Sequence, residues 1–352
     1  MELDASDPLA SFREQFHLPV RDGRTQTYLC GHSLGLQPKH TAQLINEELA
    51  QWQSRGVGGH FEGDRPWFSY HELLTPALAE LTGAVTSEVV AMNSLTVNLH
   101  LMLMSFYRPT SQRYRILIEH GAFPSDRYAV TSQIRLHGYD PATALLTIKP
   151  RDGEDIVHTE DVISLLEREG QSIATVMLPG VQYLTGFVHQ RHATGNLPRL
   201  AGWWGHDKNS RFDMPAEFSP IAGAEGWQLS DPPILACTPL LASLKVFKEA
   251  GMNRLRKKSL LLTAYLRHLL QTWLKDKVNI ITPSSDDEHG NQISLRLHTS
   301  VEHAKQIHQQ LLDRDFVTDW REPDIIRVAP VPLYNRFEEV WSFANALREI
   351  MR

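Results

Sequence analysis

Short apolar runs alternate with amphipathic stretches along the first half of the chain. Residues 114–118 and 173–178 are apolar and rich in β-branched residues, whereas residues 37–56 and 161–169 carry apolar residues at helical spacing. Strands that alternate with helices are typical of βαβ units around a parallel sheet. We therefore predict an α/β fold with a mostly parallel sheet flanked by helices.

The pattern changes in the second half of the chain. Residues 240–274 have helical spacing, residues 292–297 alternate like a half-buried strand, and residues 337–351 form a closing helix. Asn335, followed three positions later by Glu338, predicts a capped start for this helix. These elements indicate a smaller α+β domain.

We expect three segments in all. Residues 1–36 form an N-terminal arm that belongs with the small domain, residues 37–239 the large domain, and residues 240–352 the small C-terminal domain.

The composition and charge of the chain indicate which kinds of binding partner to expect. The 352 residues are 42% hydrophobic and carry a net charge of -6, so neither a nucleic acid nor an anionic membrane is expected as a partner. No apolar run reaches the roughly 18 residues of a membrane helix, and the start of the chain has no secretory pattern. The two cysteines, Cys30 and Cys237, show no metal-ligand spacing. A cytoplasmic protein with a small-molecule substrate and no bound metal is the expectation.

Two segments could bind an anion and an aromatic ring. Residues 92–100 place asparagine, serine and threonine before an apolar helical run, and a helix N-terminus attracts phosphate. An ordinary helix cap gives the same pattern. Residues 121–126 follow a predicted strand, where open α/β sheets bind ligands, and Phe123 could lie on a heteroaromatic ring or belong to the core.

Three further side chains have open interpretations. Arg327 lies in an apolar run and needs an anionic partner, either a protein carboxylate or a ligand carboxylate. One indole of Trp203 and Trp204 could donate to a phosphate or substrate, while core packing suits at least one of the rings. His60, in a glycine-rich loop, could contact substrate or be solvated.

Other enzyme classes lack their motifs. His71 is followed by Glu72, but no second histidine stands four positions after it, so no zinc-binding pair lies on one helical face. A phosphate-binding P-loop is absent as well.

Several long strings resemble the kynureninase family and follow the family's order. Apart from one gap, the similarity runs over nearly the whole chain, and the strings are residues 28–39, 94–100, 122–126, 200–206, 230–235 and 326–335. His32, Pro179 and Asp231 depart from this pattern, since the family usually has asparagine, serine and asparagine there.

The resemblance implies a pyridoxal 5'-phosphate enzyme of fold type I. Such an enzyme is a homodimer with active sites at the subunit interface, and it hydrolyses L-kynurenine or 3-hydroxy-L-kynurenine to L-alanine and anthranilate or 3-hydroxyanthranilate. The reaction belongs to tryptophan degradation and NAD biosynthesis.

The resemblance also implies a role for individual residues. Leu95 and Thr96 would hold the cofactor phosphate, and Phe123 would stack on the pyridine ring. The rest of the implied site is the pocket wall Pro124, Ser125 and Asp126, then Trp203 and Asp231 on the phosphate or substrate side, Arg327 at the substrate carboxylate, and His60 near the substrate ring.

The sequence has no match to the segment that carries the family's catalytic lysine. In the family, several tens of residues after a Tyr-Leu-Thr-Gly sequence supply an aspartate for the pyridine nitrogen and the lysine that forms the Schiff base. Here residues 183–186 have that sequence, but Phe187 continues with what resembles the sequence after the lysine. We therefore expect no catalytic lysine and a large-domain sheet that lacks central strands, because the segment is missing between Gly186 and Phe187.

Two rivals remain open. One is a catalytically dead relative or truncated product that binds ligand without turnover. The other is a lyase of the same fold, such as a cysteine desulfurase, but Cys30 and Cys237 lie inside other motifs rather than in a mobile loop.

Overall fold

The large-domain sheet is short and entirely parallel. The structure is a computed structural model that describes residues 2–187 and 199–352. β4 (Arg115–Glu119) lies between β5 (Leu145–Ile148) and β6 (Ile173–Met177), and both pairings are parallel. The two strands predicted at 114–118 and 173–178 are confirmed to within one residue.

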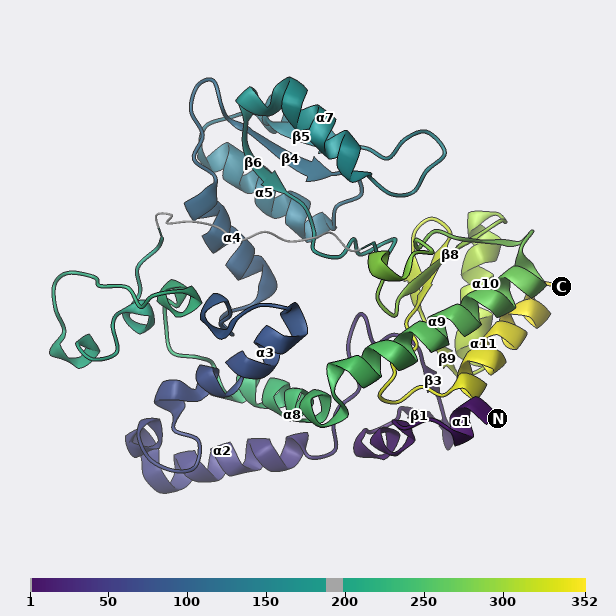
Figure 1. The fold of residues 1–352 in the computed structure, drawn as a ribbon, viewed down its shortest axis with the longest axis horizontal. Helices are drawn as coiled ribbons and strands as arrows, with labels where there is room; N and C mark the ends of the chain where they lie inside the picture. Colours follow the sequence, from purple (N-terminus) through teal and green to yellow (C-terminus); the bar gives the residue numbers. More distant parts are fainter. Residues whose placement is uncertain (1, 188–198) are drawn as a thin grey trace.

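Helices cover both faces of this sheet, as the α/β prediction requires (Figure 1). On one face, α4 (Leu95–Phe106) and α5 (Pro124–Leu136) pack against Ile116 and Ile118 of β4. On the other face, α7 (Thr159–Glu169) packs against Leu117. The short α6 (Pro141–Ala144) leads into β5. Along β4, Ile116 and Ile118 thus pack into one hydrophobic core and Leu117 packs into another.

The sheet is incomplete on the side of β6, as the sequence predicts. β6 pairs only with β4 within the described residues, and Val176 is 42% exposed. α4 has no charged residue, yet only Leu103 and Ser105 are buried along it, and Leu95 is 75% exposed. Parallel sheets are normally buried on both faces, so an apolar helix and a strand edge in solvent mark the place of absent neighbours.

A second, antiparallel sheet forms the C-terminal part. Its strands, in order, are β10 (Asp319–Arg321), β11 (Ile325–Val328), β8 (Ile293–Leu297) and β7 (Val278–Ile280). It shares a core with α9 (Met252–Leu274), α10 (Val301–Asp313) and α11 (Phe337–Ile350). The strand predicted at 292–297 and the closing helix are confirmed.

The helical region predicted at 240–274 is confirmed, but it is divided into two helices, α8 (Ile234–Ala250) and α9, because Gly251 adopts a φ of 79° that ends α8. One local prediction in this part is wrong. The cap of α11 is Arg336 with Glu339, not Asn335 with Glu338. Asn335 instead donates to the backbone oxygen of Tyr28, which ties the N-terminal arm to this part.

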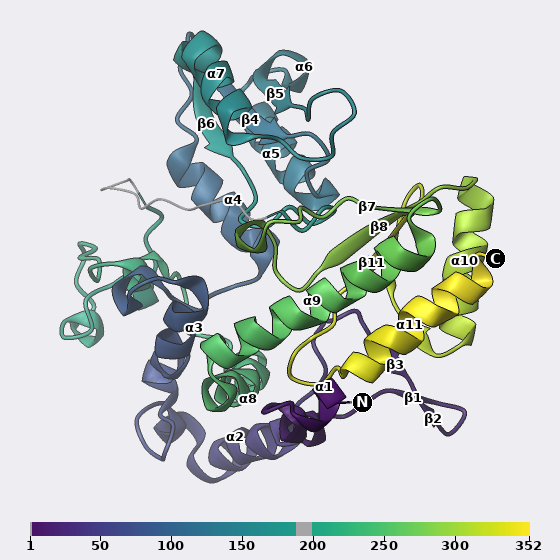
Figure 2. The ribbon, with the colours of Figure 1, turned by 45° about the vertical axis from the view of Figure 1, so that its right-hand side comes forward.

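The N-terminal arm packs on the C-terminal sheet region (Figure 2). β3 (Thr27–Tyr28) pairs in parallel with β9 (Phe316–Val317), and Leu29 enters the C-terminal core. The remaining elements of the arm are α1 (Glu2–Ala5), β1 (Val20–Arg21) and β2 (Arg24–Thr25).

Two further helices and an irregular segment complete the fold. α2 (Thr41–Arg55) packs against α8, and α3 (Thr75–Thr82) lies beside it. Residues 199–233 lie on the side of α3 and α4 away from the C-terminal sheet in Figures 1 and 2. None of the helices in the described ranges is both long and apolar enough to cross a membrane.

Candidate active site

Two helix N-termini meet at the candidate phosphate site. Thr96 lies in the first turn of α4 and Ser125 in the first turn of α5, and their hydroxyl oxygens are 3.1 Å apart. Pro124 starts α5 at a position where proline's missing N–H costs nothing. Free N–H groups and two hydroxyls therefore converge in one place, which is the arrangement that binds a phosphate dianion.

An aromatic wall adjoins this point. Phe123 is 39% exposed, and its ring meets the ring of Tyr183 edge to face, with centroids 5.3 Å apart. Asp126 follows in the first turn of α5, and burial raises the pKa of its carboxyl. Phe123 is thus available to a flat ligand on the side that Tyr183 does not cover.

Arg327 finds its anionic partner in the protein. It is 4% exposed in the middle of β11, and it donates through Nε to Asp319, the residue opposite it on β10. Nη2 also pairs with Asp319, and Nη1 donates to the backbone oxygen of Tyr183 at 2.6 Å. Of the two interpretations that the sequence left open, the structure shows the protein carboxylate.

The surroundings of Arg327 nevertheless keep an excess of positive charge. Arg321 also pairs with Asp319, at 3.0 Å, so two guanidinium groups share one carboxylate. Burial alone would raise the pKa of Asp319, but His32, Arg327 and Arg321 outweigh it and lower that pKa to about 2. A single additional anion would balance this group.

His32 completes the group around Asp319. Its Nε2 lies 3.7 Å from the Asp319 carboxylate, its side chain is 8% exposed, and burial lowers its pKa. Cys30 is close enough that these three side chains could hold a cation, but Arg327 and Arg321 repel one. The group formed by His71, Glu72 and Glu225 has the same drawback, because Lys208 sits 2.7 Å from each glutamate.

A second set of predicted residues gathers elsewhere. Trp203 donates through Nε1 to the backbone oxygen of Arg211 at 3.1 Å, while the ring itself is 43% exposed. Arg211 is buried over the rings of Trp204 and Phe68. Trp204 is therefore the ring that packs in the core.

His60 and Asp231 belong to this second set. Burial raises the pKa of Asp231, and the charges of His60 and Arg211 oppose that rise, so the three groups interact. The His60 ring also meets the edge of Trp67, with centroids 5.5 Å apart.

The two sets do not touch within one chain. Among the described residues, no hydrogen bond, ion pair or ring contact joins the set around Thr96, Phe123 and Arg327 to the set around Trp203 and His60. The segment 199–233 lies across α4 from the C-terminal sheet, which accounts for the separation (Figure 1). Phe106 of α4, stacked on Trp227 at 6.2 Å, is the ring contact between α4 and that segment.

No lysine joins either set. Lys208 pairs with Glu72 and Glu225, and Lys258 pairs with Asp7 and donates to the backbone oxygen of Pro332. The other lysines form no hydrogen bond or ion pair with the predicted residues in the described ranges. The described residues thus offer a phosphate-binding site, an aromatic wall and a guanidinium, without an amine bonded to any of them.

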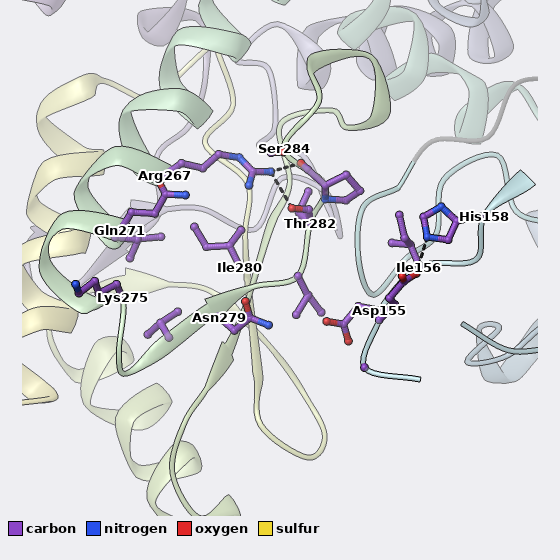
Figure 3. A pocket seen from close by; sticks show the side chains of 16 residues that line it. Asp155, Ile156, His158, Arg267, Gln271, Lys275, Asn279, Ile280, Thr282 and Ser284 are labelled. Carbon is purple, nitrogen blue, oxygen red and sulfur yellow. Dashed lines mark hydrogen bonds and ion pairs between the residues drawn. The ribbon is translucent and has the colours of Figure 1, made fainter. Parts of the chain in front are cut away.

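A surface hollow of about 560 Å³ lies apart from these residues (Figure 3). It lies between residues 153–158 on one side and α9 and β7 on the other. Two of its polar groups bond to other lining residues: Arg267 donates to the backbone oxygens of Thr282 and Pro283, and His158 bonds Glu154 at 2.5 Å. None of the predicted site residues lines it, so we do not assign the active site there.

Sequence reasoning missed Tyr183 and Asp319. Asp319 could have been found from the hairpin that a turn at residues 322–324 implies, because such a turn places 319 opposite 327. Tyr183 carries no local signal, since its contact to Arg327 uses a backbone oxygen.

Comparison with known proteins shows the family of the chain. A family model described as "Kynureninase C-terminal domain" matches residues 255–347. Proteins named kynureninase from Koribacter versatilis and Myxococcus xanthus are each 45% identical to the chain, over 98% of the chain and 95% of their own length. One from Xanthomonas campestris is 42% identical over 95% of the chain.

Solved structures show the same fold. A cysteine desulfurase from Thermococcus onnurineus superposes with a TM-score of 0.66 at 13% identity, covering 99% of this chain and 97% of that one. A cysteine desulfurase from Escherichia coli gives 0.65 at 14% identity, covering 97% and 98%. At this identity the similarity concerns the fold alone, and it confirms the predicted fold type I class.

The alignments also give a minimum number of positions at which this chain has no residue. The alignment with the Koribacter protein spans 407 positions, whereas the chain has 352 residues, so at least 55 positions, the difference between the two, have no residue here. Identities of 42–45% over alignments that cover 95–98% of the chain show common descent. This chain belongs to the kynureninase family.

Proposed function

We propose that the chain retains the family's ligand-binding elements but cannot carry out the family's reaction by itself. The family hydrolyses L-kynurenine or its 3-hydroxy form with pyridoxal 5'-phosphate, in the kynurenine route of tryptophan degradation. The cofactor, when bound, stores the electrons of a substrate carbanion. That chemistry needs a lysine, and in the described part of the chain Lys208 and Lys258 form ion pairs elsewhere, with Glu72 and Asp7.

The observation that carries the binding proposal is the pair of hydroxyls at two helix N-termini beside an exposed aromatic ring. Thr96 and Ser125 would bind the cofactor phosphate together with the backbone N–H of Leu95, and Phe123 would face the pyridine ring. Pro124 and Asp126 would form the adjoining wall. These residues fit the phosphate and the ring, and they do not fit a covalent link.

We assign the substrate side of the site to Arg327 and to the second set of residues. The excess positive charge around Arg327 would attract a carboxylate, while His60, Trp203 and Asp231 would lie near the substrate ring or the phosphate. A homodimer accommodates their separation, because residues of one subunit can complete the site of the other. A homodimer in the cytoplasm, and a link to NAD biosynthesis, are parts of this proposal. So is the division into segments 1–36, 37–239 and 240–352.

The binding proposal predicts cofactor retention without covalent attachment. Purified chain should bind pyridoxal phosphate reversibly in equilibrium dialysis, and borohydride should label no lysine. Thr96→Val combined with Ser125→Ala should weaken binding about a hundredfold or more, because each of the two lost hydrogen bonds to a charged group is worth about 1.5–3 kcal/mol.

The matched control combines Thr82→Val and Ser54→Ala. These changes remove the same two types of hydroxyl at positions away from the site, where the hydroxyls donate to backbone oxygens of their own helices. Equal affinity of the Thr96/Ser125 variant and this control would contradict the assigned phosphate site. Covalent labelling of one lysine would contradict the claim that the chain lacks the catalytic amine.

This proposal corresponds to the binding protein without turnover that the sequence left open as a rival. The buried, fully paired Arg327 favours it, because a guanidinium already held by Asp319 is stable without substrate. The desulfurase rival has no support beyond the fold, since Cys237 is buried and Cys30 lies against Asp319 and Arg327.

A further inference from the structure

Residues 182–187 form a compact turn that is bonded to itself. The backbone N–H of Gln182 donates to the oxygen of Phe187 at 2.7 Å, and that of Gly186 donates to the oxygen of Gln182 at 2.8 Å. The side-chain oxygen of Gln182 accepts from the backbone N–H of Leu184. Gly186 has a φ of 78°, which other residues rarely adopt. We refer to residues 182–187 as the Tyr183 turn.

The Tyr183 turn is fastened to the C-terminal sheet by two buried side chains. Ser294 on β8 donates its hydroxyl to the backbone oxygen of Leu184 at 2.5 Å. Gln292, just before β8, donates through Nε2 to the backbone oxygen of Tyr183 at 3.0 Å. These bonds connect a segment that follows β6 in the large-domain sheet with a strand of the other sheet.

The same turn occupies Arg327. The oxygen of Tyr183 accepts from Nη1, and the Tyr183 ring lies 5.8 Å from the guanidinium of Arg327 and 5.7 Å from that of Arg321. Nε and Nη2 already serve Asp319. Each nitrogen of the guanidinium therefore has a protein acceptor, and the side chain is buried while the turn is in place.

We propose that the Tyr183 turn takes the place of a ligand carboxylate at Arg327 and must leave before such a ligand binds. Ser294 and Gln292 are then positioning residues that hold the site closed. A carboxylate can displace the turn because a charged acceptor bonds a guanidinium more strongly than a neutral carbonyl does, and the Arg321–Asp319–Arg327 group has one uncompensated positive charge. This inference rests on the proposed function for the identity of the ligand.

Hydrogen exchange on the full chain tests the displacement directly. The amide hydrogens of Gln182 and Gly186 should exchange slowly in the free protein, and saturating L-kynurenine should accelerate them several-fold because their bonds open. The corresponding amine without the carboxyl group should have no effect. Unchanged or slower exchange at these amides while L-kynurenine binds would show that the turn stays in place, and would overturn the proposal.

Loosening the fastening provides a second test by calorimetric titration with L-kynurenine. Ser294→Ala removes one bond that holds the turn closed, so affinity should increase about fivefold, the effect of one net hydrogen bond. The control is Ser243→Ala, which also removes a hydroxyl that donates to a backbone oxygen, on α8 away from the turn. Equal or weaker affinity in Ser294→Ala than in this control would contradict the proposal.

Arg327→Lys separates this inference from the proposed function. If L-kynurenine binds equally well to the wild type and to Arg327→Lys, or binds to neither, the carboxylate site itself is wrong and the inference falls with it. If binding depends on Arg327 but the turn's exchange and the Ser294 variant show no effect, the inference alone fails.

Discussion

Inserting the relatives' additional segment between Gly186 and Phe187 should convert the chain into an active kynureninase. The segment would supply the lysine and the aspartate that the family uses, and positioned acid–base groups alone contribute about 10²–10⁴-fold to a rate. Anthranilate fluorescence measures turnover of L-kynurenine, and a visible absorption band that survives dialysis measures covalent cofactor. The unmodified chain should show neither.

The insertion should also repair the large-domain sheet. New strands would cover the free edge of β6 and the exposed apolar residues of α4, so thermal stability should increase together with activity. An inserted segment whose lysine is changed to alanine is the control, since it should restore stability without turnover. An inactive protein with the intact segment, folded and saturated with cofactor, would show that Gly186 and Phe187 are not the place of the gap.

Asp319→Ala should be among the most destabilising single changes in the C-terminal sheet. It leaves Arg327 buried without its carboxylate, and removing one partner of a buried ion pair costs about 3–5 kcal/mol. Urea denaturation at pH 7 measures the free energy of unfolding. Asp161→Ala, which breaks the exposed pair with Arg151, should cost at most about 1 kcal/mol.

The same pair predicts the pH dependence of this stability. The folded pKa of Asp319 is about 2, below its ordinary value of 3.8, so its contribution is fully present above about pH 4 and is lost as the pH falls through 2. The shift corresponds to about 2 kcal/mol. Denaturation curves of the wild type and of Asp319→Ala should therefore differ most above pH 4 and approach each other near pH 2. A constant difference from pH 5 to pH 2 would contradict the assigned pairing.

Local pattern and shared strings predicted the parts of the molecule that depend on neighbouring residues. The apolar runs at β4 and β6 predicted both strands; β4, between two neighbouring strands, is buried, whereas β6 is only partly buried, with Val176 42% exposed. Thr96 could be assigned to a helix start because a capping pattern is local, whereas Ser125 was predicted only to follow a strand; the structure places it at the start of α5 and brings the two hydroxyls together. The absence of the catalytic lysine was also readable, because it is a property of the sequence itself.

Contacts between distant segments were decided by the tertiary structure. Whether Arg327 meets a protein carboxylate or stays free for a ligand depends on how β10 registers against β11, and the register places Asp319 opposite it. The contact between Tyr183 and Arg327 uses a backbone oxygen, and only the folded chain brings residue 183 next to residue 327. Hydrophobic period and residue type describe a segment's own preferences, whereas these contacts arise from packing one segment on another, which no local pattern encodes.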